Sequence, residues 1–220
     1  MSYDVIRAGD ARSILGALLP PGVVAVEARG AVAPEPLFAE EEAYVARAVA
    51  SRRLEFARGR TCARRALAEL AIEPGPVPAE PDRAPRWPAG AIGSITHTRD
   101  VYCCAIAARA GTWTSLGVDA EQLRALEPGV QDKIVLPTEQ RALARLASSI
   151  AWPCVVFSVK EAIFKASYPL DRRWLDFLDV EVQLDPAGGA FSAFELANPA
   201  RTFAGRFALD GELVISTLAM

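Results

Sequence analysis

Residues 91–121 read AIGSITHTRDVYCCAIAARAGTWTSLGVDAE, and this stretch predicts three successive strands. We expect the strands at 92–98, 101–109 and 115–121. The second is apolar along most of its length, which is typical of a strand in the middle of a sheet. This strand-rich centre of the chain therefore predicts a sheet with helical stretches on either side of it in the sequence.

Helices and strands alternate in blocks outside this centre. Before it, we expect a strand at 23–28 and helices at 13–19, from Glu40 onward, and at 51–70. After it, the patterns predict helices at 124–133, 138–148 and 152–167 and strands at 180–184, 191–196, 202–209 and 212–218. Residues 74–88 contain six prolines, which predicts an extended surface loop.

The order of helices followed by strands occurs twice, which predicts an α+β fold of two similar-sized α/β halves. We expect the halves at 1–112 and 113–220. No sequence repeat links them.

The composition excludes several classes of protein. With 51% hydrophobic residues the 220-residue chain is expected to fold, and its net charge of −3 argues against nucleic-acid binding. We predict no membrane insertion, no signal peptide and a cytoplasmic location. The four cysteines lack CxxC spacing and only one histidine is present, so we expect reduced thiols and no zinc site.

Two carboxylates end the third central strand. Asp119 and Glu121 are two residues apart, so both side chains lie on one face of a strand. Like charges at this distance repel unless a cation or a basic group lies between them, and magnesium, which prefers oxygen ligands, is one solution. The alternative is a strand that ends in a polar turn.

The 152–167 helix adds Glu161 and Lys165, which are four apart and share a face. They form either an ordinary intrahelical ion pair or a third metal carboxylate with a phosphate-binding cation. Upstream, Arg52 and Arg60 are eight apart on a helix, where they bind a polyanion or line a solvated basic face. His97 follows a glycine and two hydroxyls, and such a segment binds phosphate or is structural.

Together these groups favour phosphoryl transfer. Three carboxylates for a cation, basic residues for phosphates and no internal nucleophile fit a reaction in which catalysis is mainly positioning and charge neutralisation.

Four ordered stretches carry a family resemblance: RRLEFARGR (52–60), WPAGAIGSITH (87–97), GVDAE (117–121) and FSVKEAIFKA (157–166). With them the chain resembles the 4'-phosphopantetheinyl transferases, in particular the enterobactin-synthase and surfactin-type group. Phe157 departs from the pattern, because many members have tryptophan there.

The resemblance implies a pseudo-twofold fold of two α/β halves, with coenzyme A and a metal in the cleft between them. It assigns Asp119, Glu121 and Glu161 to Mg²⁺ and Lys165 to the coenzyme A phosphates. Further contacts to coenzyme A are expected from Arg52, Arg60, Thr96 and His97, and from Arg83 or Arg86. Glu139 loosely matches an additional acidic residue of some members.

The activity implied is transfer of 4'-phosphopantetheine from coenzyme A to a serine of an apo acyl or peptidyl carrier protein, with release of 3',5'-ADP. Asp119, Glu161 and Lys165 are the expected catalytic residues, with Glu161 as the base. We expect a monomer that serves siderophore, non-ribosomal peptide or polyketide biosynthesis. The alternatives are another magnesium-dependent phosphodiester enzyme and a non-catalytic module that binds coenzyme A or carrier proteins.

Overall fold

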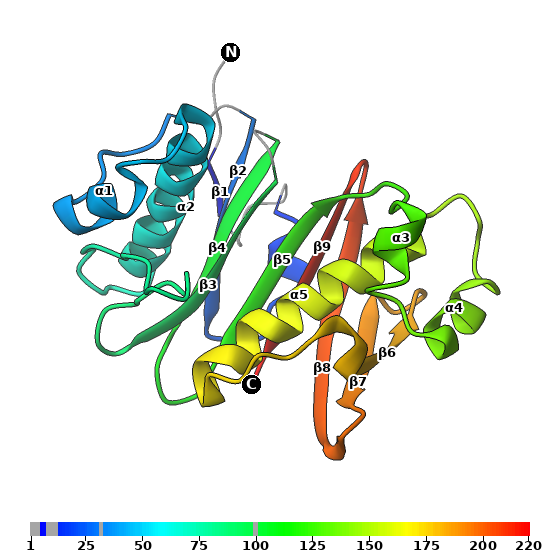
Figure 1. Cartoon of the computed structure of the whole chain (residues 1–220). Helices are drawn as coiled ribbons and strands as arrows, with labels where there is room; N and C mark the ends of the chain where they lie inside the picture. The colour runs from blue at the N-terminus through cyan, green and yellow to red at the C-terminus, as the bar shows by residue number, and fades with distance from the viewer. Residues whose placement is uncertain (1–4, 8–12, 31–32, 99–100) are drawn as a thin grey trace. The chain divides into compact units, whose positions relative to one another are not determined.

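The computed structural model describes residues 5–7, 13–30, 33–98 and 101–220. The chain forms two compact units, Met1–Leu116 and Gly117–Met220, and each contains an antiparallel sheet and helices (Figure 1). This confirms the α+β class. Within the described ranges, each helix is too short or too polar to cross a bilayer.

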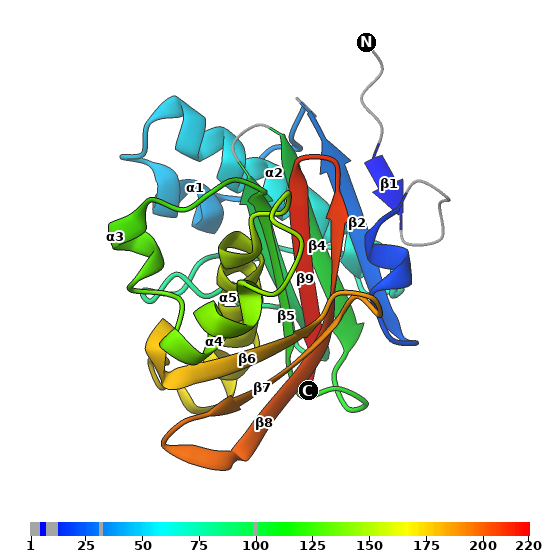
Figure 2. The same ribbon diagram turned by 90° about the vertical axis from the view of Figure 1, so that its right-hand side faces the viewer.

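The sheet of the first unit has four strands in the order β1-β2-β4-β3. Its elements are β1 (Val5–Arg7), η1 (Leu15–Ala17), β2 (Val23–Arg29), α1 (Ala39–Val45), α2 (Ala50–Glu69), β3 (Ala91–Thr98) and β4 (Tyr102–Arg109). The apolar strand β4 lies between β2 and β3, as its sequence predicts. Helix α2 packs against the sheet (Figures 1 and 2), where its Cys62, Ala63 and Leu67 join the core.

The sheet of the second unit has five strands in the order β5-β9-β8-β7-β6. Its elements are β5 (Leu116–Gln122), α3 (Pro128–Gln131), α4 (Pro137–Leu143), α5 (Trp152–Asp171), η2 (Phe177–Asp179), β6 (Val180–Asp185), β7 (Ala190–Glu195), β8 (Asn198–Asp210) and β9 (Leu213–Ala219). Helix α5 lies along this sheet (Figure 2) and buries Val155, Val159 and Ile163 completely.

Three predicted helices are wrong in length. The helix expected at 124–133 is only the four-residue α3, which begins at Pro128 because a proline lacks an N–H group and fits only the first turn. The helix expected at 138–148 ends at Leu143. The helix expected at 13–19 is the three-residue 3₁₀ turn η1.

The proline-rich segment forms no helix, as predicted, but it is not entirely a surface loop. Ala79 and Pro85 form an isolated bridge, and Val77 is fully buried in the core of the first unit.

One buried ion pair organises the second unit. Glu139, the third residue of α4, accepts the N–H of Leu136 on Oε2 at 2.7 Å and the N–H of Val182 on Oε1 at 2.8 Å. Lys160 of α5 donates to the same Oε2 at 2.9 Å. The Lys160 side chain is 2% exposed, and burial lowers its pKa although Glu139 opposes this. The pair ties α4, α5 and β6 together.

The first unit contains the same arrangement. Glu41, the third residue of α1, accepts the N–H of Phe38 on Oε2 at 2.9 Å and that of Val77 on Oε1 at 2.8 Å. Arg64 of α2 donates to Glu41 Oε2 at 3.0 Å. In both units a seven-residue helix therefore places a buried glutamate against a cation of the following twenty-residue helix. The two units share this structural motif although the sequence shows no repeat.

Replacing Lys160 with methionine is expected to lower the free energy of unfolding by about 3–5 kcal/mol, because Glu139 then keeps a buried charge without its cation. Urea unfolding measures the loss. Lys133→Met, at an exposed lysine of the same unit, is the control and is expected to stay within about 0.5 kcal/mol of the parent. Equal stabilities of the two variants would contradict the role of the pair.

Candidate active site

Gly117 sets the spacing between β5 and α5. A Cβ at this position would lie 2.0 Å from the carbonyl oxygen of Ala162 and 2.9 Å from Leu218 Cδ2. Only a glycine therefore allows the backbone of α5 to come this close to the strand. Asp119 and Glu121 follow at period two and lie on the same face as Gly117, directed toward α5.

Asp119 and Lys165 join this strand to the helix. Lys165 Nζ donates to Asp119 Oδ1 at 2.6 Å, and the Asp119 side chain is 3% exposed. Burial lowers the pKa of Lys165, but the charges of Asp119, Glu161 and Glu121 outweigh it and the pKa is raised. The ammonium group therefore stays charged among three carboxyl groups.

The other two carboxyl groups feel the same cluster. Burial, and next the charge of Asp119, raise the pKa of Glu121 to about 7, although Lys165 opposes the shift. Burial also raises the pKa of Glu161, where Lys165 opposes and Asp119 adds to the effect. The four residues that the sequence singled out on 117–121 and 157–166 therefore influence one another electrostatically. We call them the carboxylate cluster: Asp119, Glu121, Glu161 and Lys165.

The donor set of the carboxylate cluster suits a hard cation, because it offers only carboxylate oxygens. A divalent cation would relieve the repulsion by Asp119 that adds to the effect of burial on the pKa of Glu121. Across the described ranges, no three His, Cys, Asp or Glu side chains are gathered closely enough to hold a metal ion. The oxygen donors are of the type that Mg²⁺ prefers, but in this structure Asp119 is bonded to Lys165 and the three carboxyl groups are not gathered around one point.

The first unit places Arg52 and His97 in contact. Arg52 Nη1 lies 2.8 Å from His97 Nε2, and α2 reaches this end of β3 because Gly59 passes close to Ile95. A Cβ at Gly59 would lie 2.9 Å from Ile95 Cγ2, two residues before His97 on the same face of β3. Two of the predicted phosphate ligands are thus neighbours.

Arg60 has a buried position on α2. Its Nε donates to the carbonyl of Val77 at 2.8 Å and its guanidinium lies 3.8 Å from the Phe56 ring centroid. Burial lowers the pKa of Arg60 to about 10, with Glu41 opposing and the charge of Arg52 adding to the effect. Arg60 thus holds the proline-rich segment, and its role toward a phosphate remains a prediction.

The remaining predicted ligands are separate from the Arg52–His97 pair. Thr96 is buried and lies on the face of β3 opposite to His97, since neighbours alternate along a strand. Arg83 occupies an exposed turn with φ of 75°. Arg86 is also exposed and pairs with Glu40 of α1 at 2.9 Å. Their contacts to coenzyme A remain predictions.

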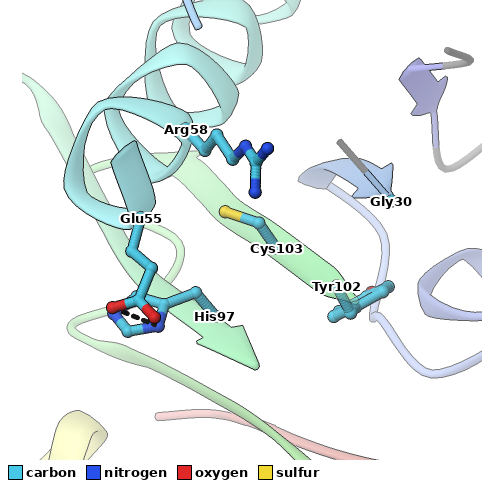
Figure 3. A pocket seen from close by; sticks show the side chains of 6 residues that line it. All are labelled: Gly30, Glu55, Arg58, His97, Tyr102 and Cys103. Atoms are coloured by element: carbon cyan, nitrogen blue, oxygen red, sulfur yellow. Dashed lines mark ion pairs between the residues drawn. The ribbon is translucent and has the colours of Figure 1, made fainter. Parts of the chain in front are cut away.

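Sequence reasoning missed the pocket around His97. It is lined by Gly30, Glu55, Arg58, His97, Tyr102 and Cys103 (Figure 3). Glu55 lies within the RRLEFARGR stretch, and its position three residues after Arg52 places the two on one helix face. That spacing was the sequence signal that Glu55 lies beside Arg52.

Comparisons with known proteins identify the family of the chain. The family model of the 4'-phosphopantetheinyl transferase N-terminal domain matches residues 40–108, and that of the 4'-phosphopantetheinyl transferase superfamily matches residues 115–217. The chain is 40% identical to 4'-phosphopantetheinyl transferase Svp of Streptomyces mobaraensis, over 94% of this chain and 89% of the relative. It is 36% identical to 4'-phosphopantetheinyl transferase PptT of Mycobacterium tuberculosis, over 82% and 85%.

A shorter match is Enterobactin synthase component D of Escherichia coli O157:H7, 36% identical over 57% of this chain and 60% of the relative. The two family models divide the chain between them, and both the basic stretch of α2 and the carboxylate cluster lie within the matched residues. The chain is therefore an enzyme that belongs to the 4'-phosphopantetheinyl transferase superfamily.

Proposed function

We propose that this enzyme transfers the 4'-phosphopantetheine group of coenzyme A to a serine hydroxyl of an apo carrier protein and releases 3',5'-ADP. Membership of the family and relatives that are named as 4'-phosphopantetheinyl transferases support the proposal. The observation that carries it is the carboxylate cluster, in which Lys165 Nζ of α5 lies 2.6 Å from the buried Asp119 Oδ1 of β5, and Glu121 and Glu161 lie on the same strand and helix.

Asp119, Glu121 and Glu161 would hold a magnesium ion. When bound, Mg²⁺ supplies charge neutralisation and Lewis acidity toward a pyrophosphate. The ion and the ammonium of Lys165 would share the charge of Asp119, since Lys165 Nζ lies 2.6 Å from Asp119 Oδ1. Lys165 is then available to a phosphate oxygen.

The reaction forms a bond between the carrier serine oxygen and the phosphorus that bears pantetheine, and it breaks the bond from that phosphorus to the oxygen of the departing ADP. Glu161, or a water that it orients, takes the serine proton. Lys165 offsets the charge that develops on the ADP.

The carrier that we propose belongs to siderophore, peptide or polyketide assembly. The relative named Enterobactin synthase component D supports this choice of pathway class.

Intact-mass measurement tests the activity. The protein is incubated with coenzyme A, magnesium and an apo carrier, and the carrier is expected to gain one phosphopantetheine unit while an equal amount of 3',5'-ADP appears. The absence of a gain on acyl and peptidyl carriers alike would contradict the proposed function. Full activity after removal of divalent cations with EDTA would contradict the metal alone.

Asp119→Asn tests the carboxylate cluster, because it removes the charge at nearly constant volume. We expect kcat/KM for transfer to fall by about 100-fold or more. This is the upper end of the loss of activity that follows when a residue hydrogen-bonded to a metal ligand is mutated, and a ligand itself should matter at least as much. Glu212→Gln, at an exposed glutamate of the same unit, is the matched control and should keep the parent rate. An Asp119→Asn enzyme with the control's rate would exclude Asp119 as a ligand.

The pKa of Glu121 gives a prediction about pH. Its folded value of about 7 lies above the ordinary 4.5, so between these values the folded chain binds a proton that the unfolded chain releases. Glu121 therefore makes the free energy of unfolding decrease as pH rises through this window.

Glu121→Gln removes this contribution. In metal-free buffer, the decrease between pH about 5 and about 7.5 should be smaller in the variant than in the parent, as measured by urea unfolding. The same decrease in both proteins would show that Glu121 ionises normally.

A further inference from the structure

We propose that Glu55 is a positioning residue, which fixes the tautomer of His97 so that this ring holds Arg52 toward a coenzyme A phosphate. The inference rests on the proposed function, because it takes coenzyme A as the ligand of Arg52.

The contact between Arg52 and His97 determines where the imidazole proton lies. A guanidinium has five N–H donors and no acceptor. Arg52 Nη1 lies 2.8 Å from His97 Nε2, so Nε2 must be the acceptor. The ring is then neutral in this arrangement and carries its proton on Nδ1.

Glu55 faces that proton. Its Oε2 lies 3.8 Å from His97 Nδ1 and 3.5 Å from Arg52 Nη1, so one carboxylate oxygen attracts both partners. Figure 3 shows the carboxylate against the His97 ring. Glu55 is the acidic residue among the six that line the pocket, and its side chain is 18% exposed.

The three side chains therefore form a relay from an acid through a histidine to an arginine. A carboxylate at Nδ1 stabilises the Nδ1–H tautomer, as in sites where the partner of one ring nitrogen decides the role of the other. Nε2 of His97 then accepts a hydrogen bond from a single N–H group of Arg52. The remaining donors of the guanidinium stay available in a fixed direction, which suits a phosphate that accepts two parallel hydrogen bonds.

Restricting Arg52 before the ligand arrives also lowers the entropy cost of binding. Arg52 is 44% exposed and would otherwise sample many rotamers in water. Holding such a side chain before the ligand arrives removes part of the entropy loss on binding. The effect of Glu55 should therefore appear in the affinity for coenzyme A and much less in the rate of the bound complex.

The NMR test uses the fact that His97 is the only histidine of the chain. Untagged, ¹⁵N-labelled protein gives one set of imidazole nitrogen signals, whose shifts distinguish the two tautomers. We expect the Nδ1–H tautomer in the parent and in Glu55→Gln, whose amide oxygen still presents a partial negative charge near Nδ1. In Glu55→Leu we expect a shift toward the Nε2–H tautomer. Glu55→Ala serves as a second apolar variant.

Kinetics supply a second readout. Glu55→Leu should raise KM for coenzyme A by about 10-fold and leave kcat within about twofold of the parent. The tenfold value is the lower end of the loss in affinity when a residue that orients a ligand-binding side chain is mutated. Glu55→Gln should recover most of the affinity. The matched control is Glu69→Leu, at the other end of α2, where Glu69 pairs with Arg7 at 3.0 Å; it should change neither KM nor the His97 signals.

The outcomes separate the two proposals. An unchanged Nδ1–H tautomer in Glu55→Leu, or a loss of kcat with unchanged KM, would overturn the role of Glu55. A parent protein that shows the expected tautomers but transfers nothing from coenzyme A would overturn the proposed function and leave the relay as a structural feature.

Discussion

The buried bond between Glu139 and Lys160 is the interaction on which the position of α5, the helix that bears Glu161 and Lys165, depends. Lys160 precedes Glu161 on α5, and its Nζ also donates to the carbonyls of Ile134 and Phe177 at 2.8 Å each. An ammonium in the interior needs all three acceptors, because each unsatisfied proton would carry a desolvation penalty. These acceptors lie in three different segments of the second unit, so satisfying Lys160 fixes the rotation of α5. That rotation directs Glu161 and Lys165 toward β5.

The corresponding bond between Glu41 and Arg64 in the first unit shows that two units can contain the same buried ion pair without a visible sequence repeat. The partners lie on different helices in each unit, 23 residues apart in one and 21 in the other. What is retained is a buried carboxylate at the third position of a short helix, where it also caps that helix. Such a constraint preserves charges and hydrogen bonds, whereas the surrounding apolar residues vary freely as long as they fill the core.

The sequence was sufficient where one short-range rule decided the outcome. The apolar run predicts β4 as a central strand, and strand alternation predicts that Asp119 and Glu121 share a face. It was insufficient where partners come from distant segments. The spacing of Glu161 and Lys165 left open an intrahelical pair or a phosphate-binding cation, and it could not show that Lys165 bonds to Asp119 on β5. Similarly, the spacing of Arg52 and Glu55 indicates a shared helix face, but only the fold shows that His97 of β3 lies beside them.

Both charged sites hold their functional groups in internal ion pairs. Arg52 lies against Glu55 and His97 in the first unit, and Asp119 lies against Lys165 in the second. The buried Asp119 would be poorly solvated without its partner, and Lys165 offsets this loss, whereas the partners of the half-exposed Arg52 mainly restrict its rotamers. Under the proposed function, a phosphate or a divalent cation would bind by exchanging partners with these ion pairs. Affinity is therefore lower than the sum of the new contacts, while preference for ligands of the right charge increases, because a neutral ligand cannot replace the ion pair that it would break.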